Sequence, residues 1–465
     1  EKAVVALWVC TQCQKTIPAN AKPLCDCGGE ARLKEIRGST PASRFLVLEL
    51  AERLPFEPRI LGYLRLDPPI PRMHRRTPEG VERDIRERIF PRDWFHPTYE
   101  GGADWQKALD RVNTAAARIA RVVVHPDYRS EGFGALLVRV ALEWAKERGA
   151  PEARREKHLV YTIAQMARYH PFFEKVGFRY LFDTASGRPV LFYPLTEEAE
   201  AHLERFLRED PYAKAHGGRL YKPRFGRVPG LPGPIRLAGV HKAYRSHLDL
   251  EGLSREVQEA LLAFGVKARV VERAVLRGAS LEIPPGSLVV LAGASGAGKT
   301  TLLRLLLGEA PDAGEVAVPP GRRVAYIPGE REVDLGEAPI LEAVYRRLKD
   351  VGAAIEVLNR VGLSDAVLYR ARPHELSTGQ RERFRLALLL AERPDLLLID
   401  EFAAHLDVPT ARRVALGLGK LCREAGVTLV AATHRPEVVA ALDPDLLVYV
   451  GYGGLTTVPR RGPRT

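Results

Sequence analysis

Residues 289–306 read VVLAGASGAGKTTLLRLL, and this stretch decides the fold of the C-terminal half of the chain. An apolar run typical of a buried strand leads into a glycine-rich loop and then into an apolar segment with helical spacing. Glycines allow backbone N–H groups to curl round a phosphate at the start of a helix, where the helix dipole also favours an anion. The order strand, loop, helix therefore predicts a phosphate-binding α/β domain.

The same region supplies the side chains that a nucleoside triphosphate and its metal require. Lys299 is placed to reach the β- and γ-phosphate oxygens, and the Thr300 hydroxyl to ligate Mg²⁺. A second apolar run at 396–399 ends in Asp400 and Glu401. At the end of a strand, Asp400 is expected on the Mg²⁺ and Glu401 beside the attacking water. We expect ATP to contact Gly293, Ser295, Gly296, Gly298, Lys299, Thr300 and Thr301.

Further motifs follow in a fixed order: LSTGQ at 376–380, AHLD at 404–407, and His434 after an apolar strand at 427–433. With the loop at 293–300 they resemble the motifs of the ATP-binding-cassette (ABC) ATPases. The resemblance implies that Glu401 and His434 carry ATP hydrolysis. It also implies that ATP joins two copies as a homodimer, in which one copy's signature covers the nucleotide of the other. The signature residues concerned are Ser377, Gly379 and Gln380.

Two positions depart from that family's pattern. The family's glutamine falls near Pro328-Gly329-Glu330, where no glutamine stands, and Glu330 is the candidate substitute. No aromatic residue for stacking adenine is evident upstream of the loop. Val270 and Val271 occupy the expected stretch, and Phe264 is the nearest candidate.

The middle of the chain carries a second anion-binding pattern. A strand at 118–124 leads into HPDYRSEGFG at 125–134 and then into a helix with one apolar face. Gly132 and Gly134 would let a pyrophosphate approach the backbone amides at the helix start, and Arg129 adds positive charge. A further strand at 158–163 follows.

Together with ARYHPFFEKVGF at 167–178, these features resemble the coenzyme-A-binding half of the GNAT acetyltransferases. The resemblance implies that acetyl-CoA places its thioester between the two strands. Many members use a tyrosine where Phe173 stands, so Tyr169 is the candidate general acid. His125 and His170 titrate in a suitable range, but each precedes a proline and is more often a solvated residue. The backbone amides expected at the pyrophosphate belong to Arg129, Ser130, Gly132, Phe133 and Gly134.

Arginines mixed with aromatic residues precede this region, in 68–76 and 92–96. One interpretation is a surface that contacts phosphates and stacks bases. The alternative is a solvated basic loop with Trp94 and Phe95 in the core.

Four of the five cysteines lie between residues 10 and 27. Cys10 and Cys13 form a C-x₂-C pair, and Cys25 and Cys27 form a second, tighter pair. Four thiolates suit a tetrahedral, closed Zn²⁺ site with a structural or docking role. Free thiols and an iron–sulfur site remain alternatives.

Composition limits the class of protein. The chain has 465 residues, 46% of them hydrophobic and 28% charged, and a net charge of +12, of which +9 lies in residues 1–230. This favours a polyanionic partner, and no apolar run approaches the about 20 residues of a membrane span. We expect a cytoplasmic α/β multidomain protein, without a membrane partner: a zinc ribbon (1–37), a mixed α/β GNAT domain (40–215), a basic Pro/Gly-rich linker (216–238) and a P-loop ABC domain (239–465).

The combination supports more than one function. The first hypothesis is an ATP-dependent acetyltransferase that modifies a base in tRNA or DNA, with the ABC dimer as clamp. It is similar in plan to the tRNA cytidine acetyltransferases and the phage Mom-type acyltransferases, an argument by analogy. The alternatives are an ATP-operated switch or scaffold whose GNAT domain senses acyl-CoA or is inactive, and a protein acetyltransferase or an ABC-type chromosome-maintenance protein.

Overall fold

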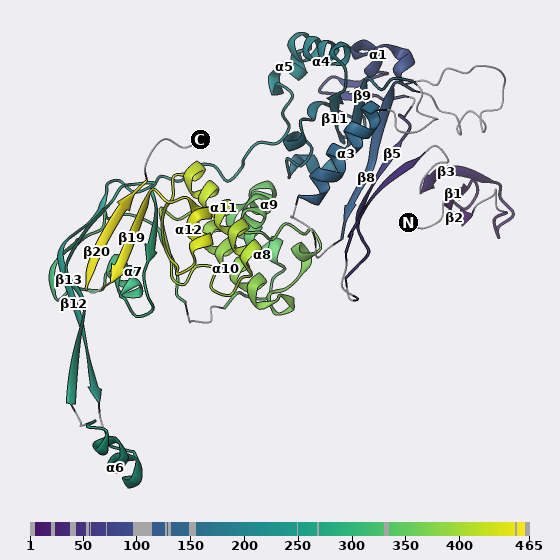
Figure 1. The fold of residues 1–465 in the computed structure, drawn as a ribbon. Helices are drawn as coiled ribbons and strands as arrows, with labels where there is room; N and C mark the ends of the chain where they lie inside the picture. The colour runs from purple at the N-terminus through teal and green to yellow at the C-terminus, as the bar shows by residue number, and fades with distance from the viewer. Residues whose placement is uncertain are drawn as a thin grey trace. The chain divides into compact units, whose positions relative to one another are not determined.

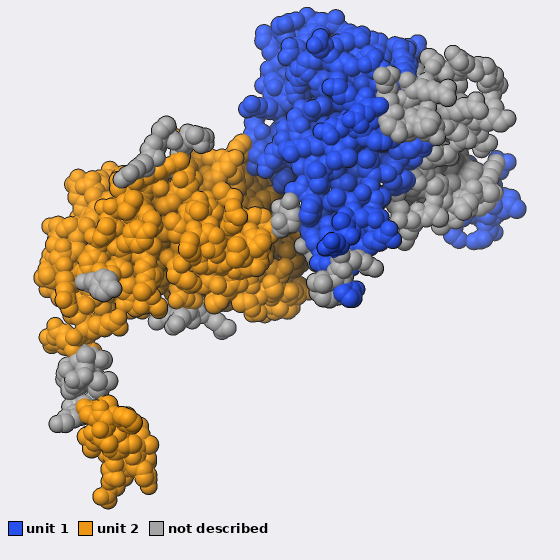
Figure 2. All heavy atoms as spheres, viewed as in Figure 1, with its two compact units in different colours: residues 1–222 blue, residues 223–465 orange. Residues whose placement is uncertain are grey.

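A computed structural model describes most of the chain as two compact units, Glu1–Lys222 and Pro223–Thr465 (Figure 2). The boundary falls inside the segment 216–238 predicted as a linker. The described ranges are 5–19, 24–37, 43–52, 55, 57–70, 72–95, 114–125, 128, 132–147, 155–248, 250–266, 269–329, 334–451 and 453–460.

Unit 1 begins with a small antiparallel sheet of order β2-β1-β3. Its strands are β1 (Val5–Cys10), β2 (Thr16–Ala19) and β3 (Ala31–Arg37). Cys10 is the last residue of β1, and Cys13 lies in the turn that follows it. Cys25 and Cys27 lie between β2 and β3.

The larger sheet of unit 1 has the order β10-β11-β9-β8-β5-β4. β8 and β9 run parallel, and the other neighbouring pairs run antiparallel. One face packs on helix α3 (Phe133–Glu147), whose apolar side chains recur at helical spacing. The strands are β4 (Arg44–Glu49), β5 (Ile60–Asp67), β8 (Ala116–Val124), β9 (Leu159–Ile163), β10 (Arg179–Asp183) and β11 (Pro189–Pro194).

A second core covers the other face of this sheet. It is closed by aromatic residues of the segment 90–95 and by helix α4 (Glu197–Glu209), and α5 (Pro211–His216) follows. Short elements complete the unit: β6 (Arg75–Thr77), β7 (Gly80–Glu82), α1 (Arg86–Ile89), and the 3₁₀ helices η1 (Arg92–Trp94), η4 (Gln165–Arg168) and η5 (Glu174–Val176).

Unit 2 is built on a sheet of order β16-β17-β18-β14-β19-β20. The pairs from β16 to β19 are parallel, and β20 is antiparallel to β19. β17 and β18 are buried along their whole length, as expected for strands covered on both faces. The strands are β14 (Leu288–Ala292), β16 (Val324–Ile327), β17 (Leu396–Ile399), β18 (Thr428–Ala432), β19 (Leu446–Gly451) and β20 (Gly454–Pro459).

Helices surround this parallel sheet and form two hydrophobic cores with it. Cys422, the cysteine outside the N-terminal cluster, is fully buried in one of them. The helices are α7 (Lys299–Leu306), α8 (Ile340–Leu348), α9 (Val351–Arg360), α10 (Thr378–Ala391), α11 (Val408–Ala425) and α12 (Pro436–Leu442), with the 3₁₀ helices η6 (Leu368–Arg370) and η7 (Pro373–Glu375).

A long antiparallel hairpin is the other part of unit 2. β12 (Ile235–Leu248) begins within the segment predicted as a linker; it pairs with β13 (Arg269–Ile283) on one side and with β15 (Ala313–Ala317) on the other. Helix α6 (Arg255–Ala263) lies in the connection between β12 and β13, at the far end of the hairpin (Figure 1). The expected α/β fold class is confirmed.

Candidate nucleotide and coenzyme sites

The carboxyl ends of three neighbouring parallel strands bring the predicted nucleotide residues together. β17, β18 and β14 are adjacent in the sheet, and they are followed by Asp400, by Thr433 and by the 293–298 loop. The Thr300 hydroxyl donates to Asp400 Oδ2 over 2.7 Å, which joins two groups that are 100 residues apart in the chain. A hydroxyl and a buried carboxylate in contact are oxygen donors that fit Mg²⁺.

The loop itself needs glycine at defined points. Gly293 has φ +146°, and a Cβ there would lie 2.2 Å from the Val450 carbonyl oxygen. Gly298 has φ +109°, and its Cβ would lie 2.5 Å from a methyl group of Val275. Lys299 Nζ donates to the Gly293 and Ala294 carbonyls, each over 2.8 Å, so its ammonium lies over the loop. The curled backbone therefore fits a phosphate group.

The remaining loop residues differ in accessibility. Ser295 and Gly296 are exposed, and the Gly296 carbonyl accepts a 2.9 Å hydrogen bond from Arg273 of β13. Thr301 lies in the first turn of α7 and is buried, with 7% of its surface exposed.

Gly329 occupies the place where the family's glutamine was expected, and it makes room for Glu401. A Cβ on Gly329 would lie 3.0 Å from the Glu401 carboxyl carbon and 3.0 Å from its Oε2. Glu401 has φ +49°, and its N–H donates to Asp400 Oδ1 over 3.1 Å. Arg385 of α10 donates to the Pro328 carbonyl over 3.4 Å. Glu330, the candidate substitute, lies outside the described residues.

The predicted signature lies at the start of α10. Ser377 caps this helix, because its hydroxyl accepts from Gln380 N over 3.3 Å while Gln380 Oε1 accepts from Ser377 N over 3.0 Å. Ser377 is exposed, and Gly379 and Gln380 are half-buried. The helix therefore presents an accessible N-terminus, which has the positive end of the helix dipole.

His434 lies two residues after the end of β18 and is exposed. The next residue, Arg435, hydrogen-bonds to two backbone carbonyls. Arg435 donates to the carbonyls of Ala403, over 2.7 Å, and Leu406, over 2.5 Å. Arg435 therefore holds the 404–407 segment to the end of β18. In the sequence, the signal that could have identified Arg435 is its position shortly after the apolar strand predicted at 427–433.

Tyr244 is an aromatic residue near the loop that the sequence reasoning missed. It pairs with Arg273 across the hairpin, so both side chains lie on one face, and Arg273 is the residue that contacts Gly296. The Tyr244 hydroxyl donates to Glu309 over 3.2 Å. Phe264, the earlier candidate, is 86% exposed directly after α6, so it does not belong to this site. An aromatic residue at the end of VHKAY, 240–244, was the available signal.

The coenzyme loop of unit 1 is partly described. Gly132 has φ +88° and open space where a Cβ would lie, and Phe133 begins α3. Gly134 faces the Phe172 ring, to which a Cβ would come within 3.0 Å. Arg129 and Ser130 lie outside the described residues. The described part of the loop thus offers open backbone at a helix start, which fits a pyrophosphate.

β8 and β9 pair over only part of β8. They pair over Ala116–Ile119 and Leu159–Thr162, and the Thr162 hydroxyl closes the paired part by donating to the Ile119 carbonyl over 3.1 Å. Beyond Ile119, β8 continues to Val124 paired with β5, whereas β9 ends at Ile163. The β8–β9 ladder therefore ends at Ile119 and Thr162, near the end of β9.

The candidate proton donors have different surroundings. Phe173 is 5% exposed and packs on Phe172 and Phe178. Tyr169 is half-buried at the end of η4. Burial, aided by Lys175, lowers the pKa of His170 to about 4, so His170 does not titrate near neutral pH as the sequence suggested.

The interpretation of the basic, aromatic-rich segment as a base-stacking surface is wrong for its aromatic residues. Trp94 and Phe95 are 3% and 2% exposed and belong to the core. Arg75 is also buried, where it pairs with Asp210 and Glu82. Arg75 and Arg76 are neighbours in the short strand β6, so their side chains point to opposite faces of it: Arg75 is buried and Arg76 is exposed.

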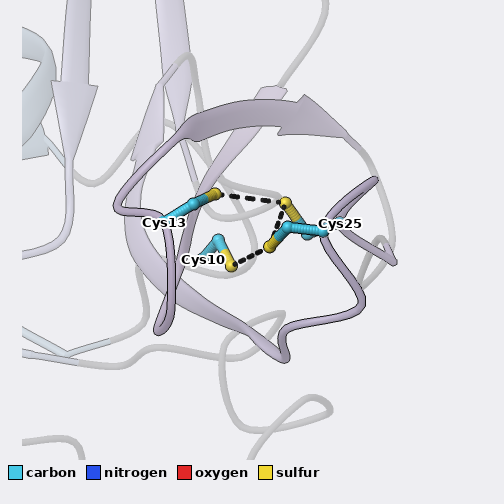
Figure 3. Close-up of side chains that lie close together, drawn as sticks. Cys10, Cys13 and Cys25 are labelled. Carbon is cyan, nitrogen blue, oxygen red and sulfur yellow. Dashed lines mark hydrogen bonds between the residues drawn. The ribbon is translucent and has the colours of Figure 1, made fainter.

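The four N-terminal cysteines converge as the spacing predicted (Figure 3). The Cys10–Cys27, Cys13–Cys25 and Cys25–Cys27 sulfur pairs are 3.4, 3.5 and 3.4 Å apart, and the four sulfurs lie within 4.8 Å of one another. Tetrahedral zinc with Zn–S bonds of about 2.3 Å would separate its sulfurs by about 3.8 Å. Gly29 allows this approach, since a Cβ there would lie 2.7 Å from Cys10 Sγ.

The pKa values of two thiols in the cluster are shifted in opposite directions. The Cys27 backbone N–H lowers the pKa of Cys25, but the hydrogen bond with the Cys27 thiol and burial outweigh it and raise this pKa to about 12. The backbone N–H of Cys13, and to a smaller extent that of Gln12, lowers the pKa of Cys10 to about 6, so Cys10 is a thiolate at neutral pH. Zinc requires thiolate ligands. The cluster therefore fits Zn²⁺.

Removing the metal should unfold the segment 5–37, because so short a segment has too little core to fold without one. We expect one zinc per chain by elemental analysis, and rapid proteolysis within 5–37 after treatment with a strong chelator. Cys13→Ser should lose the zinc, whereas Cys422→Ala should keep it. Purified protein containing no zinc, or containing iron instead, would contradict the assignment.

Among the described residues, no helix is both long and apolar enough to cross a bilayer.

Two protein-family models match separate parts of the chain. The model described as "ABC transporter" matches residues 276–404, and the model described as "Acetyltransferase (GNAT) domain" matches residues 100–180. The first range contains the 293–300 loop and Asp400, and the second contains the 132–134 loop and strands β8 and β9.

Curated relatives match part of the chain. The lipoprotein-releasing system ATP-binding protein LolD 1 of Rhodospirillum rubrum is 35% identical over 193 residues, 36% of this chain and 84% of its own length. The zinc import ATP-binding protein ZnuC of Ruegeria pomeroyi is 34% identical over 198 residues, which cover 41% of this chain and 75% of its own length. The methionine import ATP-binding protein MetN of Mesorhizobium japonicum is 34% identical over 209 residues, which cover 40% of this chain and 56% of its own length. The chain therefore spans about half of that relative.

Among solved structures, a dimeric ATP-binding cassette bound to ADP and Pi matches with 22% identity and a TM-score of 0.38; the match covers 49% of this chain and 100% of that chain. The geometry of the loop and Asp400, the family model and the relatives agree. The chain therefore belongs to the ATP-binding-cassette family, and it joins that cassette to a GNAT acetyltransferase domain.

Proposed function

We propose that this chain is an ATP-dependent acetyltransferase that uses acetyl-CoA and acts on a base in nucleic acid. The observation that carries the proposal is the presence of two separate backbone cradles on one chain. One is the 293–300 loop, beside Asp400, and the other is the 132–134 loop, at the start of α3. Each fits a different pyrophosphate-containing ligand.

In the ATP site, different residues bind the phosphates, hold the metal and orient the attacking water. The loop amides and Lys299 bind the phosphates, and Thr300 and Asp400 would hold Mg²⁺, which neutralises phosphate charge. Glu401 orients the attacking water, and His434 contacts the γ-phosphate. Tyr244 takes the adenine ring. Because the N-terminus of α10 is accessible, we propose that Ser377, Gly379 and Gln380 close the ATP site of a second copy, which makes a homodimer.

In the coenzyme site, an acceptor amine attacks the acetyl carbonyl carbon. The new C–N bond forms, the C–S bond breaks, and the amine's proton must leave while the coenzyme thiolate takes one up. The open amides of Gly132, Phe133 and Gly134, with those of Arg129 and Ser130, hold the pyrophosphate. We propose Tyr169 as the donor of the proton to the thiolate, because Phe173 has no acidic group.

Charge supports a nucleic-acid acceptor. The net charge is +12, and the arginines on either side of the buried Arg75, Arg72 and Arg76, are exposed. A closed Cys₄ module is a common docking element for nucleic acid. An extruded base costs a few kcal/mol of stacking, which ATP-driven closure of a dimer would help to supply.

A nucleoside mass measurement tests this proposal. The protein is incubated with acetyl-CoA and ATP and with either tRNA or duplex DNA, and the nucleic acid is digested to nucleosides. We expect a nucleoside heavier by one acetyl group in one of the two samples, dependent on ATP. Intact acetyl-CoA and unmodified nucleosides in both samples would overturn it, and acetylated protein in place of nucleosides would favour a protein acetyltransferase.

A second function, an ATP-operated switch whose GNAT domain senses acyl-CoA without transferring the acyl group, is favoured by one observation. The position at which the family's acid was expected holds Phe173, buried among aromatic rings. Binding of acetyl-CoA without turnover on any acceptor, together with ATP hydrolysis, would support this alternative.

A further inference from the structure

One face of the larger sheet of unit 1 is open to solvent at one end. Helices α4 and α5 contact β11 and β10, which lie at one end of that sheet. β4 and β5 lie at the opposite end. There, Phe45 and Val47 of β4 are 46% and 48% exposed. Large apolar side chains that gather on an exposed sheet face indicate a binding surface.

Alternation along β4 and β5 decides which side chains share this face. Leu46 packs against the core that lies under helix α3, so its neighbours Phe45 and Val47 point to the opposite face. The ladder sets Val47 opposite Tyr63, and Phe45 opposite Arg65. The ring centroids of Phe45 and Tyr63 are 6.1 Å apart. An exposed ring and a half-buried ring therefore lie side by side on the open face.

A bulge in β8 adds two arginines to the same face. β8 pairs with β5 (Figure 1), and the register between them shifts at Ala120, which has no partner in the ladder. An unbroken alternation would place Arg118 and Arg121 on opposite faces, because they are three residues apart. The extra residue brings both to the face of Phe45, with Arg121 directly opposite Arg65.

The charges on this face are complementary to an anion. Asp67 is 6% exposed and accepts hydrogen bonds from Ser43, over 2.7 Å, and from Arg118, over 2.8 Å. Arg65 Nε lies 3.1 Å from Asp67 Oδ1. Arg121 is exposed, and its position opposite Arg65 sets two like charges against each other, which destabilises a ladder. A phosphate beside Arg121 would relieve that repulsion.

This surface adjoins the strand that leads into the coenzyme loop. β8 ends at Val124, and the 125–134 segment follows it directly. At the other edge, Glu49 at the end of β4 pairs with Arg59 over 3.2 Å, so its charge is compensated. The surface, which we call the platform, consists of Phe45, Val47, Tyr63, Arg65, Arg121 and Val123.

We propose that a single strand of nucleic acid, the acceptor of the acetyl group, lies across the platform, with its bases stacked on Phe45 and Tyr63 and its phosphates against Arg121. This inference rests on the proposed function and names the place where its acceptor binds. Every base has a face that stacks on an aromatic ring, but only when the base is not stacked in its own duplex. An acidic peptide would match the arginines alone, whereas a nucleic acid matches both the arginines and the rings.

Fluorescence anisotropy on the full chain tests the platform, with labelled oligouridylate and oligothymidylate as the RNA and DNA single strands. Phe45→Ala should weaken the binding of a single strand by at least about tenfold, the effect of losing one base stack. A duplex of the same length should show no such loss. Phe264→Ala is the matched control, because it removes a phenylalanine of unit 2 that is 86% exposed, and it should leave the affinity unchanged.

Arg121→Ala tests the phosphate contact. We expect it to reduce the salt dependence of single-strand binding, with the slope of log affinity against log salt falling by about 0.7, the value for one phosphate of a single strand. Arg208→Ala on α4 removes an equal charge from an exposed position away from the platform. It should leave this slope unchanged.

Phe45→Trp keeps an aromatic ring at the open end of the platform. It should bind single strands as the unaltered protein does, and its fluorescence should be quenched when a base stacks on the new ring. A Phe45→Trp protein whose fluorescence does not respond to either oligonucleotide would overturn the inference. Equal affinities of Phe45→Ala and the unaltered protein would also overturn it. So would binding of a lysine-containing acidic peptide in place of both oligonucleotides, which would identify a protein partner.

The nucleoside mass measurement separates this inference from the proposed function. Acetylated nucleosides formed at equal rates by Phe45→Ala and the unaltered protein would overturn the platform and leave the proposed function intact. Binding of a single strand that depends on Phe45, without any acetylated nucleoside, would overturn the proposed function and leave the platform as a nucleic-acid site.

Discussion

Glu401→Gln is expected to lower ATP hydrolysis by about 10²- to 10³-fold while leaving ATP bound, because it removes the group that orients and activates the attacking water. The amide is close in size to the carboxylate, so the contact with Gly329 is retained. With its nucleotide unhydrolysed, the variant should accumulate as an ATP-bound dimer. Phosphate release and light scattering at saturating ATP measure the two effects.

Gly329→Ala is the structural counterpart of this variant. Its Cβ would displace the Glu401 carboxylate, which is the flexible end of a side chain, so hydrolysis should fall and folding should be little affected. Gly233→Ala, which like Gly329 lies outside the positive-φ region but has no atom within 4 Å of its Cβ position, is the control for glycine replacement itself. A Glu401→Gln protein that stays monomeric at saturating ATP would contradict the dimer, and one that hydrolyses ATP at the unaltered rate would contradict the role of Glu401.

Gly132→Val and Gly134→Val are expected to weaken acetyl-CoA binding by about 100-fold, which corresponds to the loss of two hydrogen bonds to a charged group at about 1.5 kcal/mol each. Gly132 has φ +88°, a conformation that a β-branched residue resists, so the loop would rearrange. At Gly134 the new side chain would collide with the Phe172 ring. Calorimetric titration with acetyl-CoA measures the loss.

Gly80→Val is the matched control for these variants. Gly80 has φ +140° and open space around its Cβ position, and it is the first residue of β7, outside the coenzyme loop. It should suffer similar backbone strain and keep its affinity for acetyl-CoA. Equal affinities in all four proteins would show that the 132–134 loop does not hold the pyrophosphate.

The residues that the sequence missed share one property. Tyr244 lies near the nucleotide loop because the register of a long hairpin pairs it with Arg273. Arg385 reaches Pro328 from a helix that lies 57 residues later in the chain. Neither has a local pattern, since contacts of this kind depend on how strands and helices pack.

The aromatic and basic segment shows the converse. Trp94, Phe95 and Arg75 carry the residue types of a nucleic-acid surface, yet they are buried. Composition alone does not distinguish an arginine that faces solvent from one that pairs with Asp210 in the core. Burial is a property of the assembled fold.

By itself, the sequence determined the chemistry that is written in short stretches: the 293–300 loop, the acidic pair at 400–401, the 132–134 loop and the cysteine pairs. Such motifs work through backbone conformation and neighbouring side chains, which local sequence specifies. The tertiary structure alone decided that Gly329 lies against the Glu401 carboxylate, that Tyr244 pairs with Arg273 near the nucleotide loop, and that Trp94 and Phe95 are buried in the core. Those outcomes depend on distances between elements far apart in the chain, and packing sets these distances.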